Sequence, residues 1–137
     1  MKRKKTRIYL DHAATTPPDR RGFEAMAPFF SEHFGNPGSI HKEGGLAAEA
    51  VRDARKSIAD ALRARPEEII FVSGGTEANN LAIFGFTKWL EENDRALHEC
   101  HFITTPIEHP SVLECFTHLK KQGAEVSIAP VTREGII

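Results

Sequence analysis

The chain has 137 residues, with 18 Lys and Arg against 19 Asp and Glu, 40% hydrophobic residues and a formal net charge of −1. This length is near the commonest domain size, and the balanced charge gives no reason to expect nucleic acid or an anionic membrane as a partner. The longest apolar runs, such as residues 81–86, are far shorter than the ~20 residues of a membrane helix. Two cysteines without a secretory leader indicate reduced thiols and a cytoplasmic protein. Membrane, disulfide-stapled, collagen-like and disordered classes are therefore excluded.

The first half of the chain predicts two helices separated by a short strand. From Glu43 to Ala64 the apolar residues recur in steps of three and four, which predicts an amphipathic helix. Pro66 explains the end of this helix, because proline disfavours helical backbone in the preceding residue. The run Ile69–Val72 is apolar without alternation, as in a strand of a parallel sheet that is covered on both faces. Residues 73–75 interrupt the run, and a second helix is expected over roughly residues 76–92.

The second half predicts two more strands with a helix between them. The strands are expected at His101–Thr105 and Glu125–Ala129. The helix runs from Pro110 or Ser111 to Gln122, and Gly123 is a plausible left-handed stop. Alternation of strands and helices indicates an α/β domain with parallel strands and right-handed crossovers.

The stretch Ser73–Asn80 is the strongest candidate for a binding site. Two glycines after a strand allow a ligand to approach the backbone closely, and the following helix directs its free N–H groups and positive dipole end at the same place. Thr76 adds a hydroxyl donor, so the stretch predicts a pocket for a dianionic phosphate. The nucleotide P-loop pattern is excluded, because no Gly-Lys-Ser/Thr ending follows. The alternative is a tight turn with Thr76 as a helix N-cap.

His109 follows the second predicted strand, at the same carboxyl-end edge of the sheet as Gly75. A flat imidazole at this position can stack on a planar ligand and relay protons. The alternative is an ordinary surface histidine in a loop. Together, a phosphate cradle after one strand and a stacking ring after the next predict a planar phosphorylated cofactor.

Four motifs resemble one protein family in the same order and with similar spacing. They are Ile8–Pro17, Phe34–His41, Ser73–Glu77 and Ile107–His109. They resemble signatures of the cysteine desulfurases, which are class V aminotransferases and pyridoxal-phosphate enzymes of fold type I. The Phe-Gly-Asn-Pro-x-Ser stretch is similar to the branch that supplies sulfur for iron–sulfur clusters and tRNA thiolation.

The resemblance implies a cofactor, a substrate and roles for individual residues. Gly75 and Thr76 would bind the phosphate of pyridoxal 5'-phosphate, and His109 would stack on the pyridine ring and help to move protons. The approach to the substrate would be lined by Ala13, Ala14, Thr15, Thr16 and Asn36. The family converts L-cysteine to L-alanine, and a mobile thiolate takes the sulfur as a persulfide for a sulfur-acceptor scaffold protein.

The resemblance also implies that part of the family's machinery follows Ile137. The Schiff-base lysine, the carboxylate at the pyridine nitrogen, the nucleophilic cysteine and the substrate-binding arginine all belong to that part. Cys115 lies on the apolar stripe of its helix, so we interpret it as a buried structural thiol. We therefore expect an N-terminal arm over residues 1–16 and the first half of the fold type I large domain over residues 17–137. This truncated chain should be inactive alone, and a short C-terminal strand is the alternative explanation of its apolar end.

Three alternatives remain open. The chain could be a non-catalytic remnant that binds a phosphate ligand or pairs with a full-length family member, since the family's active site lies at a homodimer interface. The basic residues Lys2–Lys5 could contact nucleic acid, although a solvated terminus is the simpler interpretation. A small zinc module would use soft and imidazole ligands, although the spacing matches no standard zinc module. Its candidate ligands are His98, Cys100, His101, Cys115 and His118.

Overall fold

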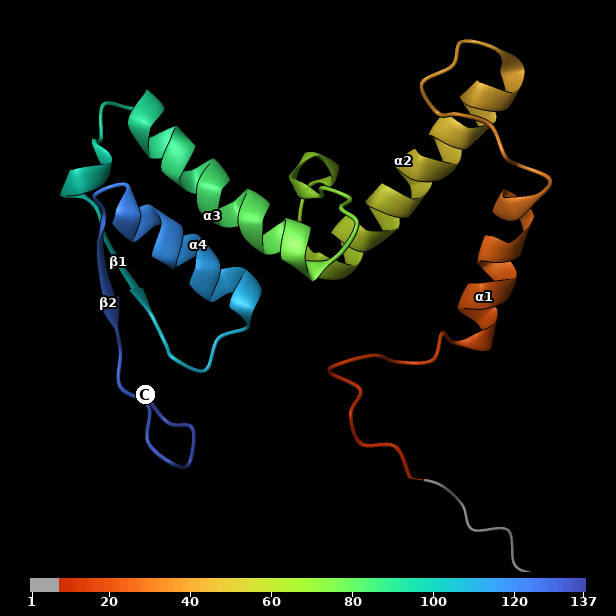
Figure 1. Cartoon of the computed structure of the whole chain (residues 1–137). Helices are drawn as coiled ribbons and strands as arrows, with labels where there is room; N and C mark the ends of the chain where they lie inside the picture. Colours follow the sequence, from red (N-terminus) through yellow and green to blue (C-terminus); the bar gives the residue numbers. More distant parts are fainter. Residues whose placement is uncertain (1–7) are drawn as a thin grey trace, which may run out of the picture. The chain divides into compact units, whose positions relative to one another are not determined.

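The computed structural model of the chain describes residues 8–137 (Figure 1). It divides into two compact units, the first ending at Ile69 and the second running from Ile70 to Ile137. Lys2–Lys5, the candidate nucleic-acid contact, lie outside the described residues. No helix in residues 8–137 combines the length and the apolar character needed to cross a membrane.

The described part of the first unit, residues 8–69, contains two α-helices and two short 3-10 helices. Helix α1 (Arg20–Met26) begins where the Asp19 side chain accepts a hydrogen bond from the backbone N–H of Arg21, and the 3-10 helix η1 (Ala27–Phe30) follows it. Helix α1 was not predicted from the sequence, because seven residues are too few to display a helical period.

Helix α2 (Lys42–Leu62) confirms the amphipathic helix expected over residues 43–64. It ends at Arg63, whose φ of 55° is left-handed, and the 3-10 helix η2 (Pro66–Glu68) comes three residues later. The expected cause of the helix end was therefore wrong. A left-handed C-cap ends the helix before Pro66 can act on it.

The second unit consists of two packed helices and a two-stranded parallel sheet. Helices α3 (Gly75–Glu92) and α4 (Pro110–Lys121) lie side by side (Figure 1). The 3-10 helix η3 (Leu97–Glu99) leads into β1 (His101–Thr104), which pairs with β2 (Glu125–Ile128).

The register of the sheet places His101 opposite Glu125 and Thr104 opposite Ile128. Gly123 has a φ of 106°, as expected for the stop after α4. The two helices and two strands expected here are confirmed.

Two predicted features of the sheet are absent from residues 8–137. The run 69–72 forms no strand, because a strand requires ladder hydrogen bonds and the described sheet contains β1 and β2 alone. Ile70 is 66% exposed, so the expected cover on both faces is also missing. Ile136 and Ile137 form no terminal strand, and instead the N–H of Thr132 donates to the carbonyl oxygen of Ile136 across a turn.

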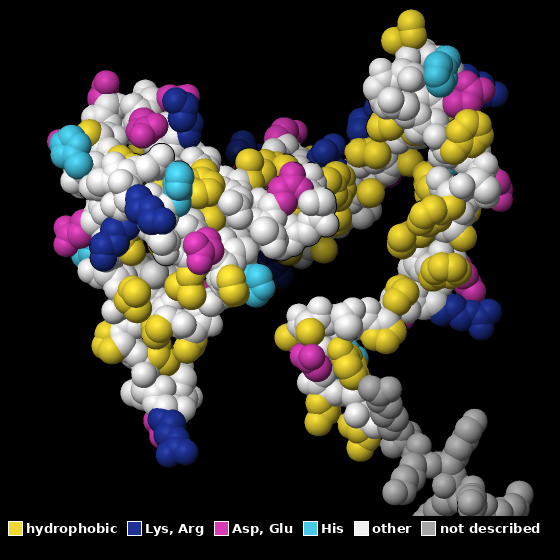
Figure 2. All heavy atoms as spheres, in the orientation of Figure 1, with side chains coloured by type: hydrophobic (Ala, Val, Ile, Leu, Met, Phe, Trp, Pro, Cys, Tyr) yellow, Lys and Arg dark blue, Asp and Glu magenta, His cyan; other side chains and the backbone are white. Residues whose placement is uncertain are grey.

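Few hydrophobic side chains in the described residues are fully buried. The largest is Leu119 of α4, which packs near Cys115 in the second unit. Figure 2 shows hydrophobic side chains at the surface of both units, and Leu10, Phe30 and Ile137 are each more than three-quarters exposed. The core that positions the candidate site is therefore the small one between α3, α4 and the two strands.

Candidate functional site

At the N-terminus of α3, the side chain that accepts backbone and hydroxyl hydrogen bonds is that of Glu77 and not that of Thr76. The Glu77 carboxylate accepts hydrogen bonds of 2.6 Å from both the backbone N–H and the hydroxyl of Ser73. These bonds, the one from the hydroxyl first, lower the pKa of the Glu77 carboxyl below its ordinary value. Gly74 occupies the N-cap position without a side-chain cap. The alternative interpretation of Thr76 as the N-cap was therefore wrong, and its hydroxyl is not used to start the helix.

The first turn of α3 has the space and the donors that an anion requires. Within the described residues, the amides of Gly75 and Thr76 donate no hydrogen bond, as is usual for the first turn of a helix. A Cβ atom added at Gly74 or Gly75 would meet nothing within 4 Å. Among the described residues the space beside these two glycines is open, so the residues present fit a phosphate group.

His109 caps the next helix of the unit. Its Nδ1 accepts a hydrogen bond of 3.1 Å from the backbone N–H of Ser111, and the hydroxyl oxygen of Ser111 lies 2.8 Å from the same nitrogen. Pro110 occupies the first helical position, where its missing N–H leaves no hydrogen bond unmade. The imidazole is thus held at the start of α4 instead of lying free in a loop.

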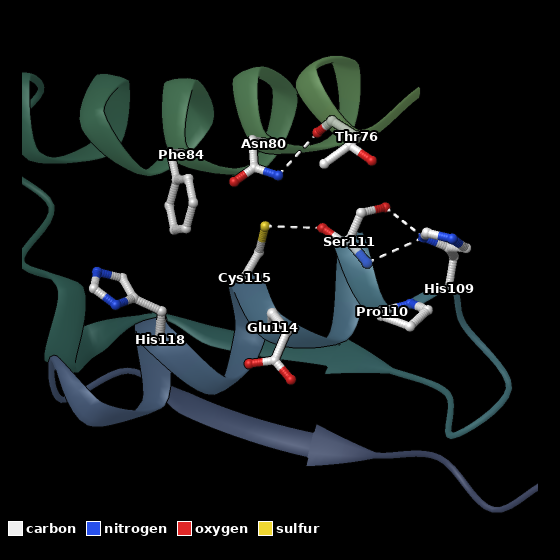
Figure 3. A pocket seen from close by; sticks show the side chains of 9 residues that line it. All are labelled: Thr76, Asn80, Phe84, His109, Pro110, Ser111, Glu114, Cys115 and His118. Atoms are coloured by element: carbon white, nitrogen blue, oxygen red, sulfur yellow. Dashed lines mark hydrogen bonds between the residues drawn. The ribbon is translucent and has the colours of Figure 1, made fainter. Parts of the chain in front are cut away.

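Thr76 and His109 line the same cavity, which has a volume of about 590 Å³ (Figure 3). Side chains of α3 form one wall, and His109 with side chains along α4 as far as His118 forms the other. The ring of His118 meets the ring of Phe84 edge-on at 5.5 Å at the far end. Gly75 is not among the lining residues, which are Thr76, Asn80, Phe84, His109, Pro110, Ser111, Glu114, Cys115 and His118.

The residues expected at the substrate approach belong to the first unit, whereas every residue that lines this cavity belongs to the second. Ala13 and Ala14 lie in a turn in which the N–H of Ala14 donates to the carbonyl oxygen of Asp11. Thr15 lines a cavity of about 520 Å³ together with Tyr9, Thr16, Pro17 and Pro18. The Asn36 side chain accepts a hydrogen bond of 2.9 Å from the N–H of Gly38.

Cys115 is a buried thiol, as the sequence predicted. It is 2% exposed, and its Sγ donates a hydrogen bond of 3.1 Å to the carbonyl oxygen of Ser111. Burial raises the pKa of the Cys115 thiol above its ordinary value, because the thiolate would be poorly solvated. Cys100 is half-buried, and neither cysteine forms a disulfide.

We expect the two thiols to react at clearly different rates with a thiol reagent under native conditions. At pH 8, Cys100 should be alkylated first, and Cys115 should react only as the chain opens, because its thiolate is disfavoured and shielded. Alkylation followed by mass spectrometry of Cys100→Ser and Cys115→Ser measures each rate alone. Equal rates in the two variants would contradict the burial of Cys115.

The zinc module receives no support from the described residues. In residues 8–137, no group of three or more His, Cys, Asp or Glu side chains could hold a metal ion. The candidate ligands have other partners: His101 contacts the Ser127 hydroxyl at 2.8 Å, and His118 packs against Phe84.

Two residues at the site, Asn79 and Ser111, had no role predicted from the sequence. The Asn79 side-chain nitrogen donates a hydrogen bond of 2.8 Å to the Ser111 hydroxyl, which links α3 to the start of α4. These residues lie 32 positions apart. The sequence signal was weak: Asn79 stands inside the glycine-containing stretch and Ser111 two residues after His109, but nothing in the sequence pairs them.

Residues 8–137 match the sequence pattern of the family described as aminotransferase class-V. The chain belongs to this family. Among its relatives, the cysteine desulfurase IscS of Dictyoglomus turgidum is 47% identical over 133 residues, and the match covers 97% of the chain and 32% of the relative. The mitosomal cysteine desulfurase of Trachipleistophora hominis is 43% identical, with 96% and 29% covered.

Two solved structures have a similar fold and sequence. A NifS-like protein matches with a TM-score of 0.81 and 38% identity over 92% of the chain and 33% of that protein. SspA in complex with cysteine matches with a TM-score of 0.80 and 41% identity over 94% and 36%. The expected fold class, the N-terminal part of the fold type I large domain, is confirmed. The chain spans about a third of the length of these relatives.

Proposed function

We propose that this chain is the N-terminal portion of a pyridoxal-phosphate-dependent cysteine desulfurase, which converts L-cysteine to L-alanine and retains the sulfur as a persulfide. The observation that carries the proposal is the position of Thr76 and His109 on one cavity beside the first turn of α3. Identity of 47% to a cysteine desulfurase and similarity to SspA in complex with cysteine support the reaction and the substrate.

In this proposal, Gly75 and Thr76 hold the cofactor phosphate. The free amides of the first turn donate to the phosphate oxygens, the helix dipole favours the negative charge, and the Thr76 hydroxyl adds a further donor. Pyridoxal phosphate, when bound, supplies the electron sink that bond cleavage next to an amino group requires. His109 lies on the other wall, where its flat ring can cover the face of a planar ligand.

His109 is the catalytic residue of the proposal. Because Nδ1 accepts the N–H of Ser111, the neutral ring carries its proton on Nε2. Nε2 has no hydrogen-bond partner within residues 8–137, so it can hold or release a proton toward a bound substrate.

The proposal also assigns a substrate approach, a source for the missing catalytic residues and an acceptor for the sulfur. Residues of the first unit, namely Ala13, Ala14, Thr15 and Asn36, would line the substrate approach. The remaining part of a full-length family member, or a homodimer partner, would supply the lysine, the nucleophilic cysteine and the arginine. A sulfur-acceptor scaffold protein would take the persulfide sulfur for iron–sulfur clusters or tRNA thiolation. The two unpaired cysteines support a cytoplasmic location, and the proposal requires neither nucleic acid nor a membrane.

The proposal is tested with a chimera in which this chain replaces the matching residues of the Dictyoglomus turgidum enzyme. The chimera should release sulfide and form alanine from L-cysteine, whereas the 137-residue chain alone should not. A correctly folded chimera that retains the cofactor without desulfurating cysteine would overturn the proposal and favour the non-catalytic remnant.

Thr76→Ala in this chimera should weaken cofactor retention by about 10- to 150-fold. This range corresponds to the loss of one charge-assisted hydrogen bond to phosphate, about 1.5–3 kcal/mol. Equilibrium dialysis against free cofactor measures the change, and Thr76→Ser is the matched control, because it keeps the hydroxyl. Unchanged retention in Thr76→Ala would remove Thr76 from the phosphate site.

A further inference from the structure

Both polar groups of Ser111 contact the same ring nitrogen of His109. Its backbone N–H lies 3.1 Å from Nδ1 of His109, and its hydroxyl oxygen lies 2.8 Å from it. A backbone N–H can only donate, so Nδ1 must be the acceptor. In the neutral ring the proton is therefore assigned to Nε2 by the hydrogen bonds around Nδ1.

The direction of the Ser111 hydroxyl is set from a different helix. The side-chain nitrogen of Asn79 in α3 donates to the Ser111 oxygen at 2.8 Å. With that lone pair occupied, the hydroxyl hydrogen is free to point to Nδ1 of His109 (Figure 3 shows the contacts from Ser111 to His109). The result is a directed chain of hydrogen bonds from Asn79 through Ser111 to His109.

The chain of hydrogen bonds begins on the element that carries the phosphate donors. Asn79 lies one helical turn after Thr76 in α3, and the Asn79–Ser111 bond is partly buried. Partial burial strengthens the bond, because water competes less well for the two groups. The helix that would hold the cofactor phosphate thus also fixes the ring on the opposite wall of the cavity.

We propose that Asn79 and Ser111 are positioning residues for His109. They hold its neutral ring as the Nε2–H form and in one orientation, so that Nε2 is the nitrogen that can exchange a proton in the cavity. The inference deepens the proposed function and rests on it for the identity of the ligand. The hydrogen-bond chain itself is a property of this polypeptide.

A purely structural role makes a different prediction. If Asn79 and Ser111 only tie α3 to α4, their removal lowers stability and leaves the proton of the ring where it was. If they position His109, their removal changes the ratio of the Nε2–H to the Nδ1–H form of the ring. The ratio is therefore the decisive measurement.

The experiment uses the 137-residue chain labelled with ¹⁵N-histidine. Long-range ¹H–¹⁵N spectra at pH 8.5 distinguish the two neutral ring forms, and His109→Gln identifies the His109 signals. In the unsubstituted chain we expect the Nε2–H form. In Ser111→Ala the ratio should fall by about threefold to tenfold, the range for loss of one hydrogen bond. In Asn79→Ala it should fall less, because the Ser111 hydroxyl remains but is no longer oriented by Asn79.

Two controls separate the effect from general damage to the fold. Ser111→Thr keeps a hydroxyl and should show the same ratio as the unsubstituted chain. Ser57→Ala removes a serine hydroxyl on exposed α2 and should leave it unchanged. A His109 ring found as the Nδ1–H form in the unsubstituted chain would overturn the inference without any variant. An unchanged ratio in a folded Ser111→Ala or Asn79→Ala chain would overturn it too.

The failure of this inference and of the proposed function can be told apart. An active chimera together with an unchanged ratio in Ser111→Ala leaves the function standing and removes the positioning role. If the ratio depends on Ser111 but the chimera is inactive, the positioning role stands and the proposed function is removed.

Discussion

Gly44→Ala should lower the free energy of unfolding of the chain by about 3 kcal/mol, a large effect for the addition of one methyl group. A Cβ atom at this buried position would lie 2.3 Å from the carbonyl oxygen of Ser39 and 2.8 Å from its carbonyl carbon. Both neighbours are backbone atoms, so they cannot rotate away as the end of a side chain could. Either α2 or the preceding loop must shift.

The matched control is the next residue of the same helix. A Cβ atom at Gly45 would meet nothing within 4 Å, so Gly45→Ala should stabilise the chain by about 1 kcal/mol through helix propensity alone. Urea unfolding followed by circular dichroism at 222 nm measures both changes. Equal midpoints for the two variants would contradict the close approach at Gly44.

This close approach matters for the substrate side of the proposal. Gly35 faces the same constraint, because its Cβ atom would lie 2.2 Å from the carbonyl oxygen of Glu43. Two glycines therefore allow the loop before α2, which carries Asn36, to pack against the first turn of that helix. A side chain at either position would displace the loop that the proposal assigns to the substrate approach.

His109→Ala should lower kcat of the chimera by about 10²- to 10⁴-fold, the usual range for loss of a general acid or base. Cofactor retention and KM should change less, because the phosphate donors of α3 remain in place. Steady-state formation of alanine from L-cysteine measures kcat and KM separately. Equal losses in turnover and in binding would indicate that the ring serves only for packing.

Two further variants separate chemistry from structure at this position. His109 is also the N-cap of α4, and loss of a cap costs about 1 kcal/mol of stability. Asparagine is a good N-cap without an imidazole, so His109→Asn should restore stability but not turnover. His118 lies in the same cavity against Phe84, and His118→Ala should reduce kcat by less than tenfold.

Much of the local structure was predictable from short-range patterns. Helix α2 is recognisable from apolar residues on one face, and β2 from the alternating Val126 and Ile128 after Gly123. The run 69–72 has an equally strong strand pattern but forms no strand, because a strand is completed by hydrogen bonds to another strand. The cause of the end of α2 was misassigned because Arg63 adopts a left-handed conformation, which its residue type does not predict.

The amino-acid sequence by itself determined helices α2, α3 and α4, strands β1 and β2, the buried character of Cys115 and the family, because periodicity, glycine placement and motif order are written along the chain. Tertiary structure alone decided that Thr76 and His109 share a cavity and that Asn79 reaches Ser111 across 32 positions. It also decided that Glu77, and not Thr76, forms the side-chain hydrogen bonds to Ser73 just before α3. These outcomes depend on which atoms packing brings within hydrogen-bond distance, and no spacing rule along one chain specifies that.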